Sequence, residues 1–187
     1  MGGNFLADFN NLTGSQPYQY FLVIGNENPT MPSLAINGKS LFYTIDQNDD
    51  NPPKTTVLFL HGLGSSSCFY KTTTPSLKSD VRCILIDTPG SGLSELGKSE
   101  QSVSSIAKDA IAVLDALKVE EKVVVVGHSM GGLVASYIAS EYPGRVKGVV
   151  LMGPVNPDPA LAYVFEKRIE VVEKGILPLI SNFDHKV

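Results

Sequence analysis

The sequence predicts an α/β protein, a three-layer α/β/α sandwich around a mostly parallel sheet, and three observations support this class. Short apolar runs that suit strands buried on both faces recur at residues 56–60, 83–86, 123–126 and 146–152. Segments with helical spacing of apolar residues lie between these runs, which predicts parallel strands joined by right-handed crossovers. The Asn-Gly pair at residues 37–38, between apolar segments 33–36 and 39–45, predicts a hairpin that adds an antiparallel edge.

Two helices are expected between the later strands. A first helix is predicted because six apolar residues share one face at helical spacing: Val103, Ile106, Ala110, Ile111, Leu114 and Leu117. A second helix is expected to begin directly after Ser129 and to end at Pro143-Gly144, a pair that stops helices.

The two ends of the chain differ from its middle. Residues 1–32 are rich in Asn, Gly and Pro and are interpreted as an N-terminal extension, whereas residues 33–155 form the predicted core domain. Residues 156–187 are interpreted as the start of a lid or cap helix and a tail. Asp158 as helix cap and Pro159 at the first helical position support this interpretation.

The composition fits an ordinary globular protein of one domain with a small appendage: 187 residues, 43% hydrophobic and 18% charged. No stretch reaches the roughly 18 apolar residues of a membrane span, and no secretory signal opens the chain, so a cytoplasmic protein is expected. The net charge of −4 and the acidic isoelectric point argue against a nucleic-acid partner. Cys68 and Cys83 form no metal spacing, and neither a metal nor an organic cofactor is expected.

The most informative motif is Gly-His-Ser-Met-Gly at residues 127–131, between the apolar run 123–126 and a predicted helix. A G-x-S-x-G pattern in this strand–turn–helix context is typical of a nucleophile elbow, a sharp turn that exposes a serine hydroxyl. Glycines on both sides of Ser129 permit the strained turn without a clash. The alternative is a tight turn of some other α/β protein, in which Ser129 only caps the helix.

A second candidate segment, His-Gly-Leu-Gly at residues 61–64, follows the first buried strand directly. Acyl transfer needs two N–H donors directed at the developing oxyanion. We expect the backbone N–H groups of Met130 and Leu63 to supply them. Gly62 is small enough to let the backbone approach the substrate closely, so Gly62, Leu63 and Met130 are the candidate oxyanion and substrate-binding residues.

Two patterns that suggest nucleotide binding have better structural explanations. Gly62-x-Gly64 follows a strand and Asp87 lies downstream, but the third glycine of a dinucleotide fingerprint is replaced by Ser67. Residues 38–40, Gly-Lys-Ser, match only the end of a phosphate-binding loop, and a hairpin turn explains them. Asp87 ends a strand, where its carboxylate is expected to accept backbone N–H groups rather than to do chemistry.

Three motifs resemble, in order and spacing, those of the α/β-hydrolase superfamily: His-Gly at 61–62, Asp-x-x-Gly-x-Gly-x-Ser at 87–94, and Gly-His-Ser-Met-Gly-Gly at 127–132. The resemblance extends from about residue 33 to residue 175 and is closest to single-domain esterases, lactonases and related hydrolases with a lid. It implies that Ser129 attacks an ester carbonyl, that a histidine takes its proton, and that an aspartate orients the histidine. It also implies that Leu63 and Met130 donate to the oxyanion.

The chain departs from the family pattern where the acid and the base should follow the serine. After Met152 it shows no further strand–helix alternation, so the fold is expected to lack its last strands. None of the three histidines is an evident base for Ser129. His61 belongs to the oxyanion loop and His128 directly precedes the serine. His185 lies near the end of the sequence, so a terminal tail would have to fold back to bring it to the serine. Asp158 stands where some members carry the acid, but helix capping explains it better. We therefore interpret the chain as a C-terminally truncated hydrolase without an evident triad acid or histidine.

The leading hypothesis is a serine hydrolase of small carboxylic esters or lactones, which acts through an acyl-enzyme on Ser129 and is weak or inactive without a base. The alternatives are a non-catalytic binding module of the same fold and a fragment that a partner completes. Strand 146–152 is expected to leave an uncovered sheet edge that promotes self-association.

Overall fold

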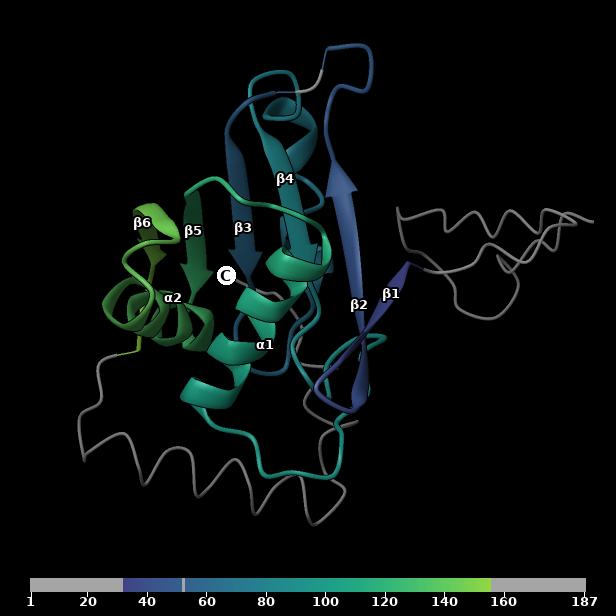
Figure 1. Cartoon of the computed structure of the whole chain (residues 1–187), viewed down its shortest axis with the longest axis vertical. Helices are drawn as coiled ribbons and strands as arrows, with labels where there is room; N and C mark the ends of the chain where they lie inside the picture. Colours follow the sequence, from purple (N-terminus) through teal and green to yellow (C-terminus); the bar gives the residue numbers. More distant parts are fainter. Residues whose placement is uncertain (1–31, 52, 156–187) are drawn as a thin grey trace, which may run out of the picture. The chain divides into compact units, whose positions relative to one another are not determined.

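The computed structural model describes residues 32–51 and 53–155, in which six strands form a single sheet. The strands are β1 (Ser33–Ile36), β2 (Lys39–Asp46), β3 (Thr56–Leu60), β4 (Arg82–Ile86), β5 (Val123–His128) and β6 (Val146–Met152). Their order across the sheet is β1-β2-β4-β3-β5-β6 (Figure 1). β1 and β4 pair antiparallel with β2, whereas β4, β3, β5 and β6 run parallel. The predicted α/β class, a three-layer sandwich around a mostly parallel sheet with an antiparallel edge, is confirmed, with α-helices on one face of the sheet and short 3₁₀ helices on the other.

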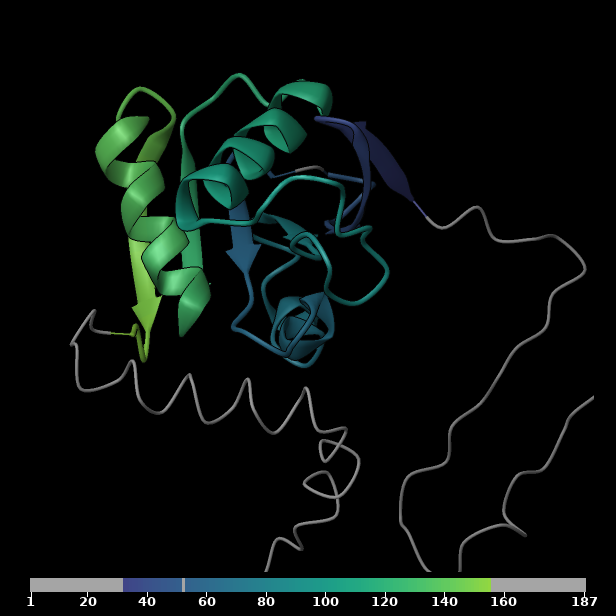
Figure 2. The ribbon, with the colours of Figure 1, turned by 90° about the horizontal axis from the view of Figure 1, so that it is seen from below.

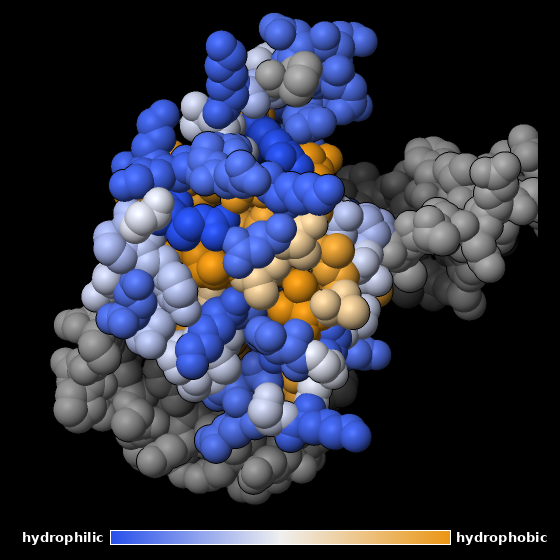
Figure 3. Space-filling view, viewed as in Figure 1, coloured by the Kyte–Doolittle hydropathy of each residue, from blue (hydrophilic) through white to orange (hydrophobic). Residues whose placement is uncertain are grey.

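Two α-helices, α1 (Val103–Ala116) and α2 (Met130–Glu141), pack on one face of the sheet (Figures 1 and 2). α1 begins at a capping box in which the side chains of Ser102 and Ser105 each accept the other's backbone N–H. Four of the six residues of its predicted apolar face are buried, Ile106, Ala110, Ile111 and Leu114, and the two at the ends of that face, Val103 and Leu117, are half-buried. The exposed side of α1 includes Lys108 and Asp115, and in Figure 3 polar residues surround a smaller apolar area on the helical side of the molecule.

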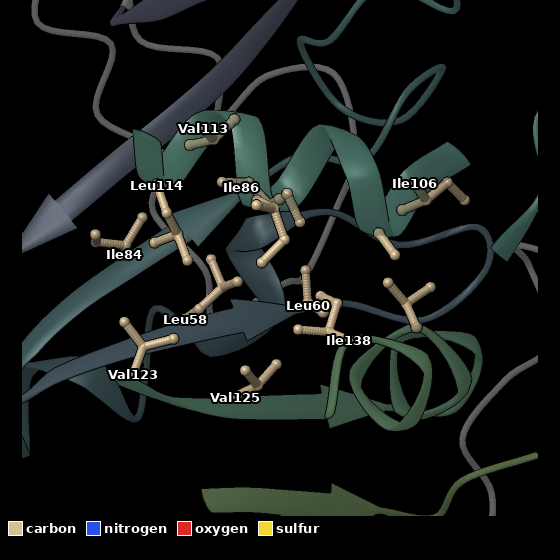
Figure 4. Packing of buried hydrophobic residues seen from close by; sticks show 14 of the residues in the cluster. Leu58, Leu60, Ile84, Ile86, Ile106, Val113, Leu114, Val123, Val125 and Ile138 are labelled. Carbon is tan, nitrogen blue, oxygen red and sulfur yellow. The ribbon is translucent and has the colours of Figure 1, made fainter. Parts of the chain in front are cut away.

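Strand β3 separates two apolar clusters, because successive side chains of a strand point to opposite faces of the sheet. Leu58 and Leu60 are fully buried on the helical face, where they pack with residues of α1, α2, β4 and β5 (Figure 4). Val57 and Phe59 pack on the other face, against the ring of Tyr70. All five residues of β3 are buried, as expected for the central strand of a parallel sheet.

The second face carries two 3₁₀ helices, η1 (Ser67–Tyr70) and η2 (Thr74–Ser76) (Figure 2). The sequence did not predict them, because helices of one turn have no apolar periodicity to detect. An apolar groove of about 560 Å³ lies between this segment and strands β5 and β6. Its lining includes Phe69, Leu77 and Met152.

The hairpin between β1 and β2 turns at Asn37 and Gly38, whose φ angles are 48° and 79°. Positive φ at both central residues is typical of the turn that Asn-Gly favours, so the predicted hairpin is confirmed. Lys39 starts β2 and is buried with an aspartate partner, which excludes a phosphate-binding role for residues 38–40.

Residues 1–31, 52 and 156–187 lie outside the described part of the chain. The predicted N-terminal extension, the helix that begins at Pro159 and the candidates Asp158 and His185 therefore stay predictions. Within the described ranges, no helix has the length and apolarity that crossing a bilayer requires.

Candidate active site

Ser129 occupies the turn between β5 and α2 with a strained backbone, at φ 53° and ψ −118°. Residues other than glycine rarely adopt such a conformation, and they keep it only where the surrounding structure enforces it. Two backbone hydrogen bonds hold the turn: Ser129 N–H donates to Met152 O at 3.0 Å, and Gly132 N–H donates to Ser129 O at 2.9 Å. The Ser129 side chain is half-buried and makes no capping hydrogen bond, so helix capping does not explain this serine.

The two glycines of the motif are required by close backbone contacts. A Cβ atom on Gly127 would collide with the carbonyl group of Gly131. A Cβ atom on Gly131 would collide in turn with the carbonyl oxygen of Leu60, at the end of β3. α2 can therefore start directly against the sheet only because both positions lack a side chain.

The loop after β3 lies against the serine turn. A Cβ atom built on Gly62 would stand 3.0 Å from the Cβ atom of Ser129 and 3.0 Å from Nδ1 of His128. Gly64 has a φ of 70°, and Ser65 N–H donates to Gly62 O at 3.2 Å, so the loop turns back at once. The Leu63 side chain points outward and is 60% exposed. The structure thus brings together two predicted segments, while the donor roles of Leu63 and Met130 stay predictions.

His61 is buried and serves the loop structurally. Thr88 N–H donates to its Nε2 at 3.0 Å, so the ring proton resides on Nδ1, which donates to Gly62 O at 2.8 Å. Burial lowers the pKa of His61 below its usual 6.5, although the Gly62 hydrogen bond and the Asp87 carboxylate oppose this shift. A neutral ring with both nitrogens occupied and no exposure has no role as a base for Ser129.

Asp87 satisfies backbone donors, as the sequence predicts. Its Oδ1 accepts Ser67 N–H at 2.7 Å and its Oδ2 accepts Leu93 N–H at 2.9 Å. A Cβ atom on Gly92, where φ is 54°, would collide with the same carboxylate. With both oxygens occupied and the side chain buried, Asp87 is not available to a ribose hydroxyl, which removes the dinucleotide alternative.

His128 packs beside the turn rather than toward a partner. Its ring stacks on Phe69, with centroids 4.4 Å apart and an interplanar angle of 16°. Its Nδ1 atom is buried without a hydrogen bond. Neighbouring Tyr70 donates its hydroxyl to Leu60 O at 3.0 Å, and burial raises the pKa of Tyr70 to about 12. Among the described residues, neither histidine hydrogen-bonds to Ser129.

Sequence reasoning missed four residues that shape this site: Ser67, Phe69, Thr88 and Leu93. Ser67, Thr88 and Leu93 contact Asp87 or His61 through backbone N–H groups, to which Thr88 adds its hydroxyl, and Phe69 stacks on His128. Such contacts leave no residue-type signature in one sequence. Within residues 32–51 and 53–155, no group of three or more His, Cys, Asp or Glu side chains is placed to hold a metal ion.

The family described as the alpha/beta hydrolase fold matches residues 55–175, more than half of the chain. The match begins at β3 and contains the Gly62 loop, Asp87 and the Ser129 turn. The β1–β2 hairpin precedes residue 55 and so lies outside the match.

Individual relatives agree with this match. The cis-3-alkyl-4-alkyloxetan-2-one decarboxylase of Shewanella oneidensis is 32% identical over 122 residues, which are 64% of this chain and 37% of the relative. A 2-hydroxy-6-oxononadienedioate/2-hydroxy-6-oxononatrienedioate hydrolase of Comamonas testosteroni is 36% identical over 135 residues, 69% of this chain and 46% of the relative. The enol-lactonase of Burkholderia xenovorans matches with a TM-score of 0.60 and 27% identity, over 63% of this chain and 45% of that one. The chain spans less than half the length of each.

Proposed function

Because this chain belongs to the α/β-hydrolase family, as its motifs imply, we propose that Ser129 is the nucleophile of a serine hydrolase of small carboxylic esters or lactones. One observation carries the proposal: Ser129 has a strained backbone at the carboxyl end of β5, with the Gly62 loop directly against its Cβ atom. Strain of this kind is concentrated at functional sites, because elsewhere it only lowers stability.

In the proposed reaction, Ser129 Oγ attacks the carbonyl carbon of the ester, and the N–H groups of Leu63 and Met130 hold the resulting oxyanion. The tetrahedral intermediate breaks the carbon–oxygen bond to the alcohol, which leaves with the serine proton, and an acyl-enzyme remains. Water then attacks the acyl carbon and releases the acid, returning a proton to Ser129. With a lactone, the acid and the alcohol are one hydroxy acid.

The substrate class is supported by what the relatives are named for. The Shewanella enzyme is named for an oxetan-2-one, a four-membered cyclic ester, and the Burkholderia enzyme is an enol-lactonase. The Comamonas enzyme is a hydrolase of an oxo-acid. Two of the three names describe cyclic esters, which supports a small-molecule ester or lactone as the proposed partner of this chain.

A second function, ligand binding without turnover, is favoured by the positions of the histidines. A serine hydroxyl is a poor nucleophile unless an adjacent base takes its proton. His61 and His128 both have other contacts in the described part of the chain. A hydrolase therefore needs a base from residues outside that part.

A fluorophosphonate probe distinguishes the two functions, because it reacts only with an activated serine. We expect the full chain to be labelled at Ser129, located by mass spectrometry of peptides, and Ser129→Ala to remain unlabelled. Turnover is then followed with p-nitrophenyl acetate and δ-valerolactone. An unlabelled wild-type chain whose thermal midpoint still rises with either compound would support the binding module and overturn the hydrolase.

A further inference from the structure

Asp87 connects two loops at the carboxyl end of the sheet: the Gly62 loop (residues 61–67), which follows β3, and the loop of residues 87–94, which follows β4. One oxygen of its carboxylate accepts an N–H group from the end of the Gly62 loop, at Ser67, and the other accepts one from Leu93. We propose that Asp87 is a positioning residue, which holds loop 61–67 against the Ser129 turn. Its catalytic consequence rests on the proposed function of Ser129, because this loop carries the Leu63 donor.

Loop 61–67 is held by hydrogen bonds at both of its ends, on either side of Leu63. At the start, the His61 ring accepts a hydrogen bond from the N–H group of Thr88, the residue after Asp87, and donates one to Gly62 O. At the end, Ser67 N–H is fixed by Asp87 itself. Between these ties, the Leu63 N–H donates no hydrogen bond to any described residue. An oxyanion donor must have no other hydrogen-bond partner and yet be immobile, and the hydrogen bonds at the two ends of the loop satisfy both requirements.

The anchor is itself rigid, because Asp87 is joined to the sheet through its backbone. Asp87 N–H donates to Phe42 O on β2 at 3.0 Å. Ser94 Oγ donates to Asp87 O at 2.7 Å and accepts Phe42 N–H at 2.9 Å. A displacement of loop 61–67 would therefore have to break the charge-assisted hydrogen bond from Ser67 N–H to a carboxylate that the sheet holds in place.

Amide hydrogen exchange, measured by NMR, tests the hydrogen bonds to Asp87 without any measurement of activity. In the wild-type chain, the Ser67 and Leu93 amides should exchange at least tenfold more slowly than the Ser66 and Gly92 amides beside them. Asp87→Asn turns one acceptor into an NH₂ donor, so the Ser67 or the Leu93 amide should lose its protection. Gly92→Ala displaces the same carboxylate without changing it and should have the same local effect.

Asp109→Asn is the matched control, because Asp109 is an equally buried carboxylate whose hydrogen bonds, among the described residues, go only to Lys39 and Asn37. It should lower the thermal midpoint while leaving exchange in loop 61–67 unchanged. Equal loss of protection throughout the core in Asp87→Asn and Asp109→Asn would overturn the proposal, since Asp87 would then act only on global stability. Unprotected Ser67 and Leu93 amides in the wild-type chain would overturn it as well.

Fluorophosphonate kinetics test the consequence for Ser129. Asp87→Asn should lower the maximal labelling rate constant about 10- to 100-fold, the effect expected when an oxyanion donor is misplaced. The probe concentration at half-maximal rate and the final labelled fraction should change little, whereas a merely destabilised protein would lose labelled fraction at an unchanged rate constant. An unchanged rate constant with a loosened loop contradicts the proposal. An unlabelled wild-type chain contradicts the proposed function, and exchange alone then decides on Asp87.

Discussion

Lys39 Nζ donates to Asp109 Oδ2 at 2.7 Å, and both side chains are only 3% exposed. Asn37 Nδ2 donates to the other carboxylate oxygen at 2.8 Å, so one aspartate of α1 holds the start of β2 and the hairpin turn before it. Removing one member leaves the other as a buried, uncompensated charge. The hairpin is thereby joined to the helical layer.

We predict that Asp109→Ala lowers the free energy of unfolding by about 3–5 kcal/mol, measured by urea denaturation, because the Lys39 ammonium then lacks a partner. The double variant Lys39→Met/Asp109→Leu should lose much less free energy of unfolding than the sum of the losses in its two single variants, because it buries no charge. Additive losses in the double variant would contradict this.

Ser129→Gly should abolish fluorophosphonate labelling and yet stabilise the fold by about 1 kcal/mol, because glycine adopts φ 53° without strain. Ser129→Ala is the control: it should also abolish labelling, but it keeps the strain and should not gain stability. Thermal and urea denaturation measure both. Equal stability of the two variants would mean that the turn stores no strain.

Gly131→Ala should destabilise the protein by about 1–3 kcal/mol or more, since the new methyl group meets the carbonyl oxygen of Leu60 in the packed core. Gly148→Ala, in β6, is the matched substitution, because nothing lies within 4 Å of the added Cβ atom. Its urea midpoint should remain at the wild-type value or rise slightly. A Gly131→Ala variant with wild-type stability would show that α2 does not need its close contact with β3.

Stability should fall as the pH drops below 6.5, because the folded state lowers the pKa of His61. The unfolded chain then binds a proton that the folded chain resists, so the unfolding free energy decreases by up to about 1.4 kcal/mol per pH unit. Above pH 6.5 this contribution is fully present and constant. His61→Gln, which is neutral throughout, should show a shallower slope between pH 6.5 and 5.5 in urea titrations. Equal slopes in the two proteins would exclude His61 as the source.

Self-association through β6 stays a prediction that the sequence motivates. Within the described residues β6 pairs only with β5, and the side chains of 149–152 are 36–48% exposed. Val150→Lys should reduce concentration-dependent association in sedimentation, because a charged side chain disfavours edge pairing. Ser140→Lys, on the exposed surface of α2, adds the same charge elsewhere and should leave association unchanged. A monomeric wild-type chain at all concentrations would refute this prediction.

The positions of the strands, of α1 and of the Ser129 turn could be predicted because each depends on local chemistry. Apolar runs such as residues 123–126 need burial on both faces, and the Asn37-Gly38 pair selects its turn by positive φ. The role of Asp87 as an acceptor of backbone N–H groups was predicted as well. The identity of its donors was not, because Ser67 lies 20 residues away in the chain.

The sequence by itself therefore determined the α/β class, the order of the elements and the serine at the turn, since strand burial and turn strain depend on neighbouring residues. Only the tertiary structure decided that His61 is buried and bonded to Thr88, that His128 stacks on Phe69, and that Asp87 accepts the N–H group of Ser67. These contacts join segments that are distant in sequence, and their partners are mostly backbone N–H groups, which every residue except proline carries alike.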